Sequence, residues 1–419
     1  MCNIPWFQVN QPSFKSFFQK YICCNCSNRK TIPDESLLWK VYLDLFFKKK
    51  LRSIYDNISG QKLWISLDET TDFLGRYIVN FLVKPLNGCS QKPFLIACKV
   101  LKVVNGNTIS EFVVECLQNK WQNSYEDKVG DVLVLCTDSV AYMLKAGRLL
   151  KQYLPNMKHV TCLAHALHRV SEKIRDEYSD VNVLISNVKK VFLKAPNRVN
   201  ILKENFPNMP LPPQPVITRW GTWLEAASYY AKYYEEIKTV VGLLRSSESI
   251  SIRNAKNILK KANLKNDVMY IDEYYRIIPI ALKSIQTSNL SIVQALDIFD
   301  EVRAVLGWCS SELVKLKLEY VINRNPDLDV IRGIRDDIVL DKQEENPSLS
   351  NYNFVPLTSV DVERSFSMYK WILNVKRNCL KVENMEKLMV IYYNSLSNNF
   401  NDNSTDTDDI FDVDDDDTD

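Results

Sequence analysis

The chain has 419 residues, of which 46% are hydrophobic and 25% are charged, and its formal net charge is +2. This composition is ordinary for a folded protein and excludes a generally disordered chain, and no apolar run reaches the roughly 20 residues of a membrane span. The length exceeds what one hydrophobic core usually organises, so we expect a large domain with a substantial insertion, or two to three lobes.

The small net charge conceals two unlike parts of the chain. Residues 398–419 contain ten aspartates and no Lys or Arg, which leaves 53 basic against 41 acidic residues, or +12, in the remainder. The acidic tail is predicted to be disordered. The basic remainder of the chain is suited to bind a polyanion such as DNA, and a block of basic residues such as 48–52 is suited to contact phosphates. Charge runs are more often solvated faces, so this signal alone does not indicate nucleic acid.

The amino terminus and the cysteines indicate an intracellular protein. No basic segment leads into an apolar stretch at the start, so no secretory signal is expected. The eleven cysteines are odd in number and most stand singly in apolar runs, as expected for small buried side chains. Cys23 and Cys26 have the spacing of half a zinc site, but no second pair or His lies nearby in the sequence.

Helices and strands alternate along the first half of the chain. Helical patterns over 13–21 and 34–59 come first, and strand patterns follow. We predict strands over 62–67, 77–86 and 92–101, a helix over 109–121, a strand over 131–136, a helix over 139–153, a strand over 159–162, and a long helix through 194. This order is typical of a ribonuclease-H-like domain, an α/β fold with a mixed sheet in which the first and fourth strands lie side by side.

Two aspartates follow the first and fourth strands. Asp68 and Asp138 are predicted just past the carboxyl ends of these strands, where open α/β sheets usually place their chemistry. Two unpaired carboxylates at close range repel each other unless a cation neutralises them, and oxygen ligands favour Mg²⁺ or Mn²⁺. An Asp after a strand also commonly caps the next helix, and this interpretation suits Asp138 before Ser139.

Several longer segments resemble conserved blocks of the hAT family of transposases. The resemblance extends from about residue 4 to 394, is weaker between 230 and 345, and is carried by blocks in the family's order. These blocks are ISLDETTDFLGRYIVNFLV (65–83), LCTDSVAYMLKAG (135–147), CLAHALHRV (162–170), ITRWGTWLEA (217–226), PLTSVDVERSFSMYKWIL (356–373) and NVKRNCLKVENMEKLMVIYYN (374–394).

The resemblance assigns roles to three acids. It implies that Asp68, Asp138 and Glu363 bind two Mg²⁺ or Mn²⁺ ions, one activating the attacking water or 3′-hydroxyl and the other stabilising the leaving oxygen. Thr358 and Asp361 have the spacing of a capping box, which predicts that Glu363 projects from the first turn of a helix beside the sheet.

Three further residues are implied to contact DNA. The resemblance places Arg219 and Trp220 near flanking DNA, where the indole stacks on an extruded base, and His165 near the scissile phosphate. The alternatives are an ordinary core Trp and a buried His on an amphipathic helix. His168, one turn further on, is expected to be structural.

The predicted domain organisation has five parts. They are a helical region (1–60), the first part of the core (61–225), an all-α insertion (226–345), the core completion with the third acid (346–397) and the acidic tail (398–419). Residues 374–396 resemble the family's dimerisation segment, and their apolar stripe suits either a partner copy or intramolecular packing. The stripe consists of Val382, Met385, Leu388, Met389, Tyr392 and Leu396.

The resemblance implies a nuclear enzyme that cleaves and transfers double-stranded DNA and assembles with itself, with no membrane partner. The chain is expected to lack the amino-terminal BED-type zinc finger with which a complete transposase finds its element ends. This departure leaves two hypotheses: an active, metal-dependent transposase, or a catalytically silent, dimerising nuclear protein derived from one that binds DNA or chromatin.

Overall fold

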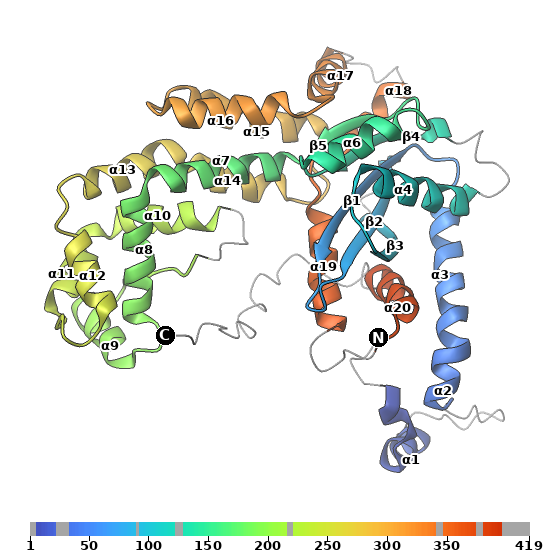
Figure 1. Ribbon diagram of the computed structural model, residues 1–419, viewed down its shortest axis with the longest axis horizontal. Coiled ribbons are helices and arrows are strands. Elements are labelled where there is room, and N and C mark those ends of the chain that lie inside the picture. The colour runs from blue at the N-terminus through green and yellow to red at the C-terminus, as the bar shows by residue number, and fades with distance from the viewer. Residues whose placement is uncertain are drawn as a thin grey trace.

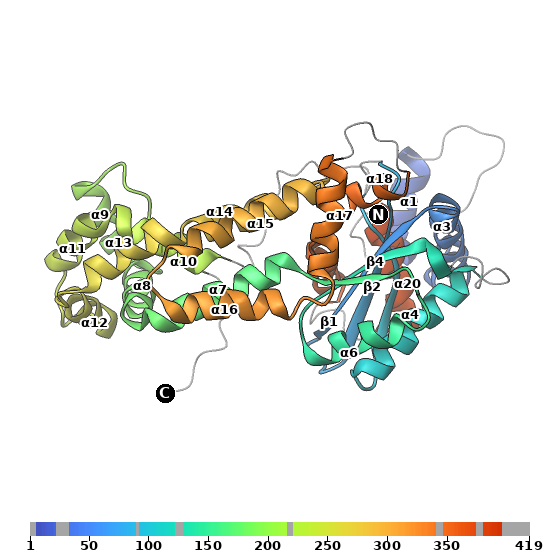
Figure 2. The ribbon, with the colours of Figure 1, turned by 90° about the horizontal axis from the view of Figure 1, so that it is seen from above.

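The structure combines one mixed β-sheet with an extended arm of helices (Figure 1). It is a computed structural model, and it describes residues 6–21, 33–88, 92–121, 129–215, 221–340, 347–373 and 380–395. The sheet lies at one end of the molecule and the helices α8 to α13 lie at the other, as the view from above also shows (Figure 2).

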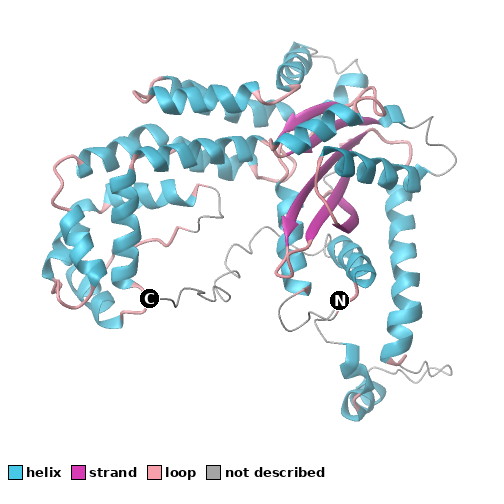
Figure 3. Ribbon diagram, viewed as in Figure 1, coloured by secondary structure: helices cyan, strands magenta, loops and turns pink. Residues whose placement is uncertain are grey.

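The sheet has five strands in the order β3-β2-β1-β4-β5. Figure 3 shows the strands lying together in one part of the molecule, with helices around them. The strands are β1 (Leu63–Thr71), β2 (Tyr77–Pro85), β3 (Phe94–Leu101), β4 (Val132–Thr137) and β5 (Lys158–Thr161). The first three strands pair antiparallel, whereas β4 is parallel to both β1 and β5. The predicted ribonuclease-H-like mixed sheet is therefore confirmed, including the contact between the first and fourth strands.

Helices cover both faces of this sheet. The helices that pack around the sheet are α3 (Leu43–Ile58), α4 (Gly106–Trp121), α6 (Ala141–Leu150), α7 (Leu163–Glu177), α19 (Val360–Ile372) and α20 (Val382–Ser395). One hydrophobic cluster joins α3, α4 and α6 to the sheet, and another joins α7, α19 and α20 to it. Residues of β1 alternate between these clusters, so Leu63, Ile65 and Leu67 face the first and Trp64 faces the second.

The arm is built of helices alone within the described residues. Its helices are α8 (Ser179–Phe192), α9 (Pro196–Asn205), α10 (Thr222–Lys232), α11 (Tyr234–Leu243), α12 (Ile250–Ile258), α13 (Leu264–Tyr275), α14 (Ile277–Ile285), α15 (Ile292–Gly307), α16 (Glu312–Asn323) and α17 (Leu328–Leu340). Short helices α1 (Pro12–Tyr21), α2 (Glu35–Leu37) and α18 (Pro347–Ser350) lie outside the arm, and a π-helical turn, Leu38–Tyr42, joins α2 to α3.

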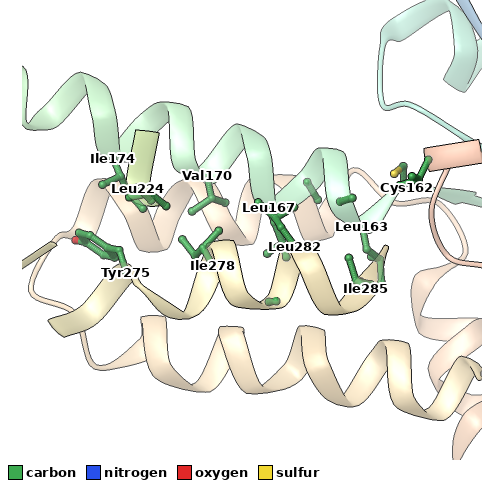
Figure 4. Packing of buried hydrophobic residues seen from close by; sticks show 14 of the residues in the cluster. Cys162, Leu163, Leu167, Val170, Ile174, Leu224, Tyr275, Ile278, Leu282 and Ile285 are labelled. Atoms are coloured by element: carbon green, nitrogen blue, oxygen red, sulfur yellow. The ribbon is translucent and has the colours of Figure 1, made fainter. Parts of the chain in front are cut away.

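Apolar packing connects the arm to the sheet. Leu167 and Val170 of α7 lie against Ile278 and Leu282 of α14, and the row continues toward Leu163 near the sheet (Figure 4). Each of these side chains is at most 2% exposed. Because α7 starts at the sheet and extends into the arm, one continuous core supports both.

Three predicted elements differ from those observed. The long helix expected through 194 is divided at Tyr178, whose φ of −102° and ψ of 56° lie outside the helical region. The helix predicted over 139–153 is shorter, because Val140 is still extended and α6 ends at Leu150. Asp68 lies inside β1 rather than past its end, because pairing with β2 continues to Thr71 beyond the last β4 partner, Ser66.

Asparagine side chains pair with the outer strands at both edges of the sheet. At the β3 edge, the backbone N–H of Leu95 donates to Asn394 Oδ1 (3.1 Å), and Asn394 Nδ2 donates to the Leu95 carbonyl (2.8 Å). At the β5 edge, Asn325 makes the same pair of bonds with Thr161, each 3.0 Å long. These amides satisfy edge groups that a further strand would otherwise bind.

Replacing Asn394 with Ala is expected to lower the free energy of unfolding by about 2 to 3 kcal/mol, because the buried N–H and C=O of Leu95 lose their partners. Urea denaturation of the variant beside the wild type measures this loss. Ser395, the next residue on α20, is exposed and provides the control, since Ser395→Ala is expected to change the free energy by less than about 1 kcal/mol. Equal stability of the Asn394 variant and the wild type would contradict this role for the amide.

The described cysteines are buried, as expected for small side chains in apolar runs. Among the described residues, Cys98, Cys116, Cys136, Cys162 and Cys309 are free and buried. A search of those same residues finds no helix that is both long enough and apolar enough to cross a bilayer.

Candidate metal centre

Three side chains from three elements meet beside the sheet. They are Asp68 of β1, His165 of α7 and Glu363 of α19, and one potential ligand atom from each lies within 4.8 Å of the other two. His165 Nε2 is 3.4 Å from Glu363 Oε1. Residues 68, 165 and 363 are remote in sequence, so the fold itself creates this cluster.

Strand alternation and a polar contact across the sheet orient Asp68 and α19. Asp68 has the same parity as Trp64 on β1, so it faces the side of the sheet that α19 covers. Its cross-strand neighbour, Asn80, is fully buried and donates from Nδ2 to Ser365 Oγ on α19 at 2.6 Å. This contact fixes α19 over β2 with Glu363 directed toward Asp68.

The start of α7 is tied to the segment that leads into α19. The backbone N–H of Leu163 donates to the Leu357 carbonyl (3.0 Å), and the N–H of Ser359 donates to the buried Cys162 Sγ (3.2 Å). Ser359 Oγ lies 3.4 Å from His165 Nδ1. The pattern Cys162-x2-His165 therefore has a structural part, the Cys, and a part within the cluster, the His.

The predicted capping box is wrong, although the predicted position of Glu363 is confirmed. The N-cap of α19 is Ser359 rather than Thr358, and no side chain caps this end. The Ser359 hydroxyl is directed to the imidazole of His165 instead of to the helix N–H groups. Glu363 nonetheless lies in the first turn of α19, as the helix pattern predicts.

Burial dominates the electrostatics of the cluster. It raises the pKa of Asp68 to about 7, and the Asp138 carboxylate adds to this rise while His165 opposes it. Burial also raises the pKa of Glu363 to about 8, against the opposing effect of His165. Both carboxyls therefore hold their protons to a higher pH than exposed acids do, because burial disfavours the charged form.

Asp138 lies next to the cluster rather than within it. It follows β4 directly, and the group of three within 4.8 Å does not include it. The Val140 N–H donates to its Oδ1 (3.3 Å), so part of the carboxylate satisfies the backbone at the start of α6. Burial raises its pKa, while charges that include Arg169 and Arg324 lower it. Asp138 is nevertheless close enough to raise the pKa of Asp68.

Glu69, next to Asp68, belongs to the opposite face of β1. Its Oε1 accepts a hydrogen bond from the Tyr142 hydroxyl of α6, in the other hydrophobic cluster. Burial raises the pKa of Glu69, and the Tyr142 hydroxyl opposes that rise. The alternation of side chains along a strand thus separates the two adjacent acids.

Other residues considered in the sequence lie elsewhere or outside the described residues. His168 pairs with Glu172 on the same helix, at 3.6 Å. The structure does not describe Arg219, Trp220, Cys23 or Cys26. Sequence reasoning missed Ser359 and Asn80; Asn80 gave a signal, because it is a polar residue at a core-facing position of its strand.

The donors of the cluster fit a divalent cation. Two carboxylates suit Mg²⁺ or Mn²⁺, while an imidazole nitrogen suits transition metals better, so Mn²⁺ fits both kinds of donor. Glu363 Oε1 is buried and accepts no hydrogen bond from the described residues, which leaves it available to a cation. A bound cation would stabilise the ionised forms of Asp68 and Glu363 and so oppose the rise in their pKa values.

Comparison with protein families supports a transposase-like domain. Residues 33–195 match a family described as a domain of unknown function, DUF659, which is related to transposases. The match includes Asp68, Asp138 and His165 but ends before Glu363. No curated protein matches the chain.

Proposed function

We propose that this chain is a hAT-type, transposase-derived protein that uses a divalent metal to cleave and transfer DNA strands. One observation carries the proposal: Asp68 and Glu363 are separated by almost 300 residues, yet ligand atoms of both lie within 4.8 Å of each other and of His165. A transposase-related family match over the first two acids supports it independently.

Each residue has a role in this proposal. Asp68 and Glu363 would hold a divalent ion, Mg²⁺ or Mn²⁺, and Asp138 would add the negative charge needed for a second ion. The ions supply charge stabilisation and an activated oxygen nucleophile for phosphoryl transfer. His165, whose Nε2 lies 3.4 Å from Glu363 Oε1, would lie near the phosphate. Arg169 and Arg324, whose charges act on Asp138, provide positive charge beside the reacting phosphodiester.

The remaining parts of the proposal concern partners and location. The excess of basic residues outside the acidic tail suits double-stranded DNA, and a nuclear location would give access to it. Arg219, Trp220 and His165 are proposed to contact that DNA. Self-association through 374–396 would have to use the outer surface of α20, because Met385 and Met389 are buried inside the chain, whereas Val382 remains 40% exposed.

A second function is favoured by the position of Asp138. Its carboxylate accepts the Val140 N–H and lies outside the cluster of three ligands, so one catalytic acid is partly engaged in structure. The alternative is a catalytically silent, dimerising nuclear protein, derived from a transposase, that binds DNA or chromatin. It would keep the fold and lack the cleavage step.

Strand cleavage distinguishes the two functions. The full chain is incubated with Mg²⁺ or Mn²⁺ and a pre-nicked DNA end, beside an Asp138→Asn variant, and products are separated on a denaturing gel. The enzyme hypothesis predicts strand-transfer or hairpin products that the variant and a chelator both remove. Background products from both proteins would exclude cleavage and favour the silent binding protein.

A further inference from the structure

A second polar site lies at the other end of the same sheet face. A cavity of about 560 Å³ is lined by the end of β2, by the segment 285–290 at and after the end of α14, and by residues of α3, α19 and α20. Lys84, which lines it, is four residues from Asn80 along β2, or roughly 13 Å. Asp361 and Arg364 of α19 also line it, whereas Glu363 does not. The cavity is therefore separate from the metal centre.

Lys84 occupies a position where the strand otherwise buries apolar side chains. Ile78, Leu82 and Leu86 share its parity and belong to the core between the sheet and α19. Lys84 is only 6% exposed, and no carboxylate among the described residues forms an ion pair with it. Burial lowers its pKa, and the charge of Asp361 opposes this effect. A Lys is rarely this buried without a partner.

The other charged groups around the cavity add to the positive charge. Lys50 and Lys92 line it, and Lys50 Nζ donates to the Asn394 carbonyl at 3.2 Å. The one acid among the lining residues, Asp361, is already paired with Arg364 at 3.1 Å. Four cationic side chains and one carboxylate therefore line the cavity, and three cations, Lys50, Lys84 and Lys92, remain once Arg364 is paired with Asp361. An anion in the cavity would balance the charge of the Lys84 ammonium.

We propose that this cavity binds a phosphate group, with the Lys84 ammonium at its centre. The volume of the cavity is within the range of small-ligand sites. Its lining is mainly polar, which suits the oxygens of a phosphate better than the alkyl chain of a fatty acid. Hydroxyls of Ser53 and Thr358 and the amide of Asn57 also line the cavity and can donate to such an anion. The phosphate belongs either to a DNA strand or to a free polyphosphate anion.

Pyrophosphate is the probe for the free-anion source, and a labelled short single-stranded oligonucleotide is the probe for the DNA source. Both are titrated into the full chain in EDTA, so that the result does not depend on metal binding or on strand cleavage. The variant is Lys84→Met, because Met keeps the stem volume and removes the buried charge. The matched control is Lys190→Met, since Lys190 is exposed on α8 in the distant arm (Figure 1).

The proposal predicts that Lys84→Met weakens binding of at least one probe by about tenfold or more and that Lys190→Met changes neither. It also predicts that Lys84→Met melts no lower than the wild type without ligand, because a buried charge lacking a partner is removed. Loss for the oligonucleotide alone assigns the site to DNA, and loss for pyrophosphate assigns it to a free anion. Unchanged binding of both probes by the folded variant would overturn the proposal, as would a clear fall in its melting temperature.

Discussion

Replacing Asp68 with Asn is expected to reduce metal-dependent strand cleavage by about a thousandfold or more, since metal ions contribute several kcal/mol to phosphoryl transfer and each 1.4 kcal/mol is about tenfold in rate. Asp68 is the carboxylate that faces both His165 and Glu363, and an amide oxygen there binds a cation far more weakly. Single-turnover cleavage of a pre-nicked DNA end measures the effect.

The neighbouring acid supplies a stringent control for this prediction. Glu69→Gln removes a carboxylate one residue away, but Glu69 belongs to the other face of β1 and binds Tyr142. We expect this variant to cleave within a few fold of the wild-type rate. An equal loss of cleavage rate in both variants would show that cleavage depends on negative charge near β1 in general and not on Asp68 as a metal ligand. Full activity of Asp68→Asn would remove Asp68 from the mechanism.

The stability of the metal-free protein is expected to fall as pH rises from about 4 to 8. Burial raises the pKa of Asp68 from 3.8 to about 7 and that of Glu363 from 4.5 to about 8, so the folded state holds protons that the unfolded state has released. Asp68 alone accounts for up to about 4 kcal/mol of this fall, and Glu363, which keeps 34% exposure, for less. Urea denaturation across this pH range in EDTA measures the slope.

The same experiment with added Mn²⁺ separates a metal site from a merely buried acid. A bound cation stabilises the ionised carboxyls of the folded state, so Mn²⁺ is expected to restore most of the stability lost near pH 8. Asp68→Asn is expected to be more stable than the metal-free wild type near pH 8 and to gain little from Mn²⁺. A wild type that loses no stability between pH 4 and 8 would contradict the raised pKa values.

The order of helices and strands was sufficient to predict the sheet and the adjacency of β1 and β4. Alternating and continuous apolar runs are local signals, and the ribonuclease-H-like order then fixes the pairing. The meeting of Asp68 and Glu363 could not follow from such signals, because 294 intervening residues separate them; it was expected only from the resemblance to hAT transposases.

The contacts that orient the site depend on tertiary structure. Thr358 and Asp361 have the spacing of a capping box, yet Ser359 becomes the N-cap because its backbone binds Cys162 and its hydroxyl meets His165. Nothing local to residues 356–363 encodes those partners. The break at Tyr178 is similar, since apolar spacing continues across it from α7 into α8.

Two departures from the pattern were readable in the sequence. Asn80 and Lys84 interrupt the inward-facing positions of β2, and each is at a polar site: Asn80 binds Ser365 above Asp68, and Lys84 faces the basic cavity. A polar residue at a core-facing position of a strand therefore indicates a function or a specific contact. Its partner can be identified only from the folded structure.

Calorimetric titration of the full chain with Mn²⁺ near pH 7, in two buffers of different ionisation enthalpy, tests the metal centre most directly. We predict saturable binding that releases protons, because the pKa of Asp68 is about 7 and that of Glu363 about 8 before the ion binds. The binding should be lost or greatly weakened in Asp68→Asn and retained in Glu69→Gln. No binding by the folded wild type, or equal affinity in wild type and Asp68→Asn, would contradict a metal centre at this cluster.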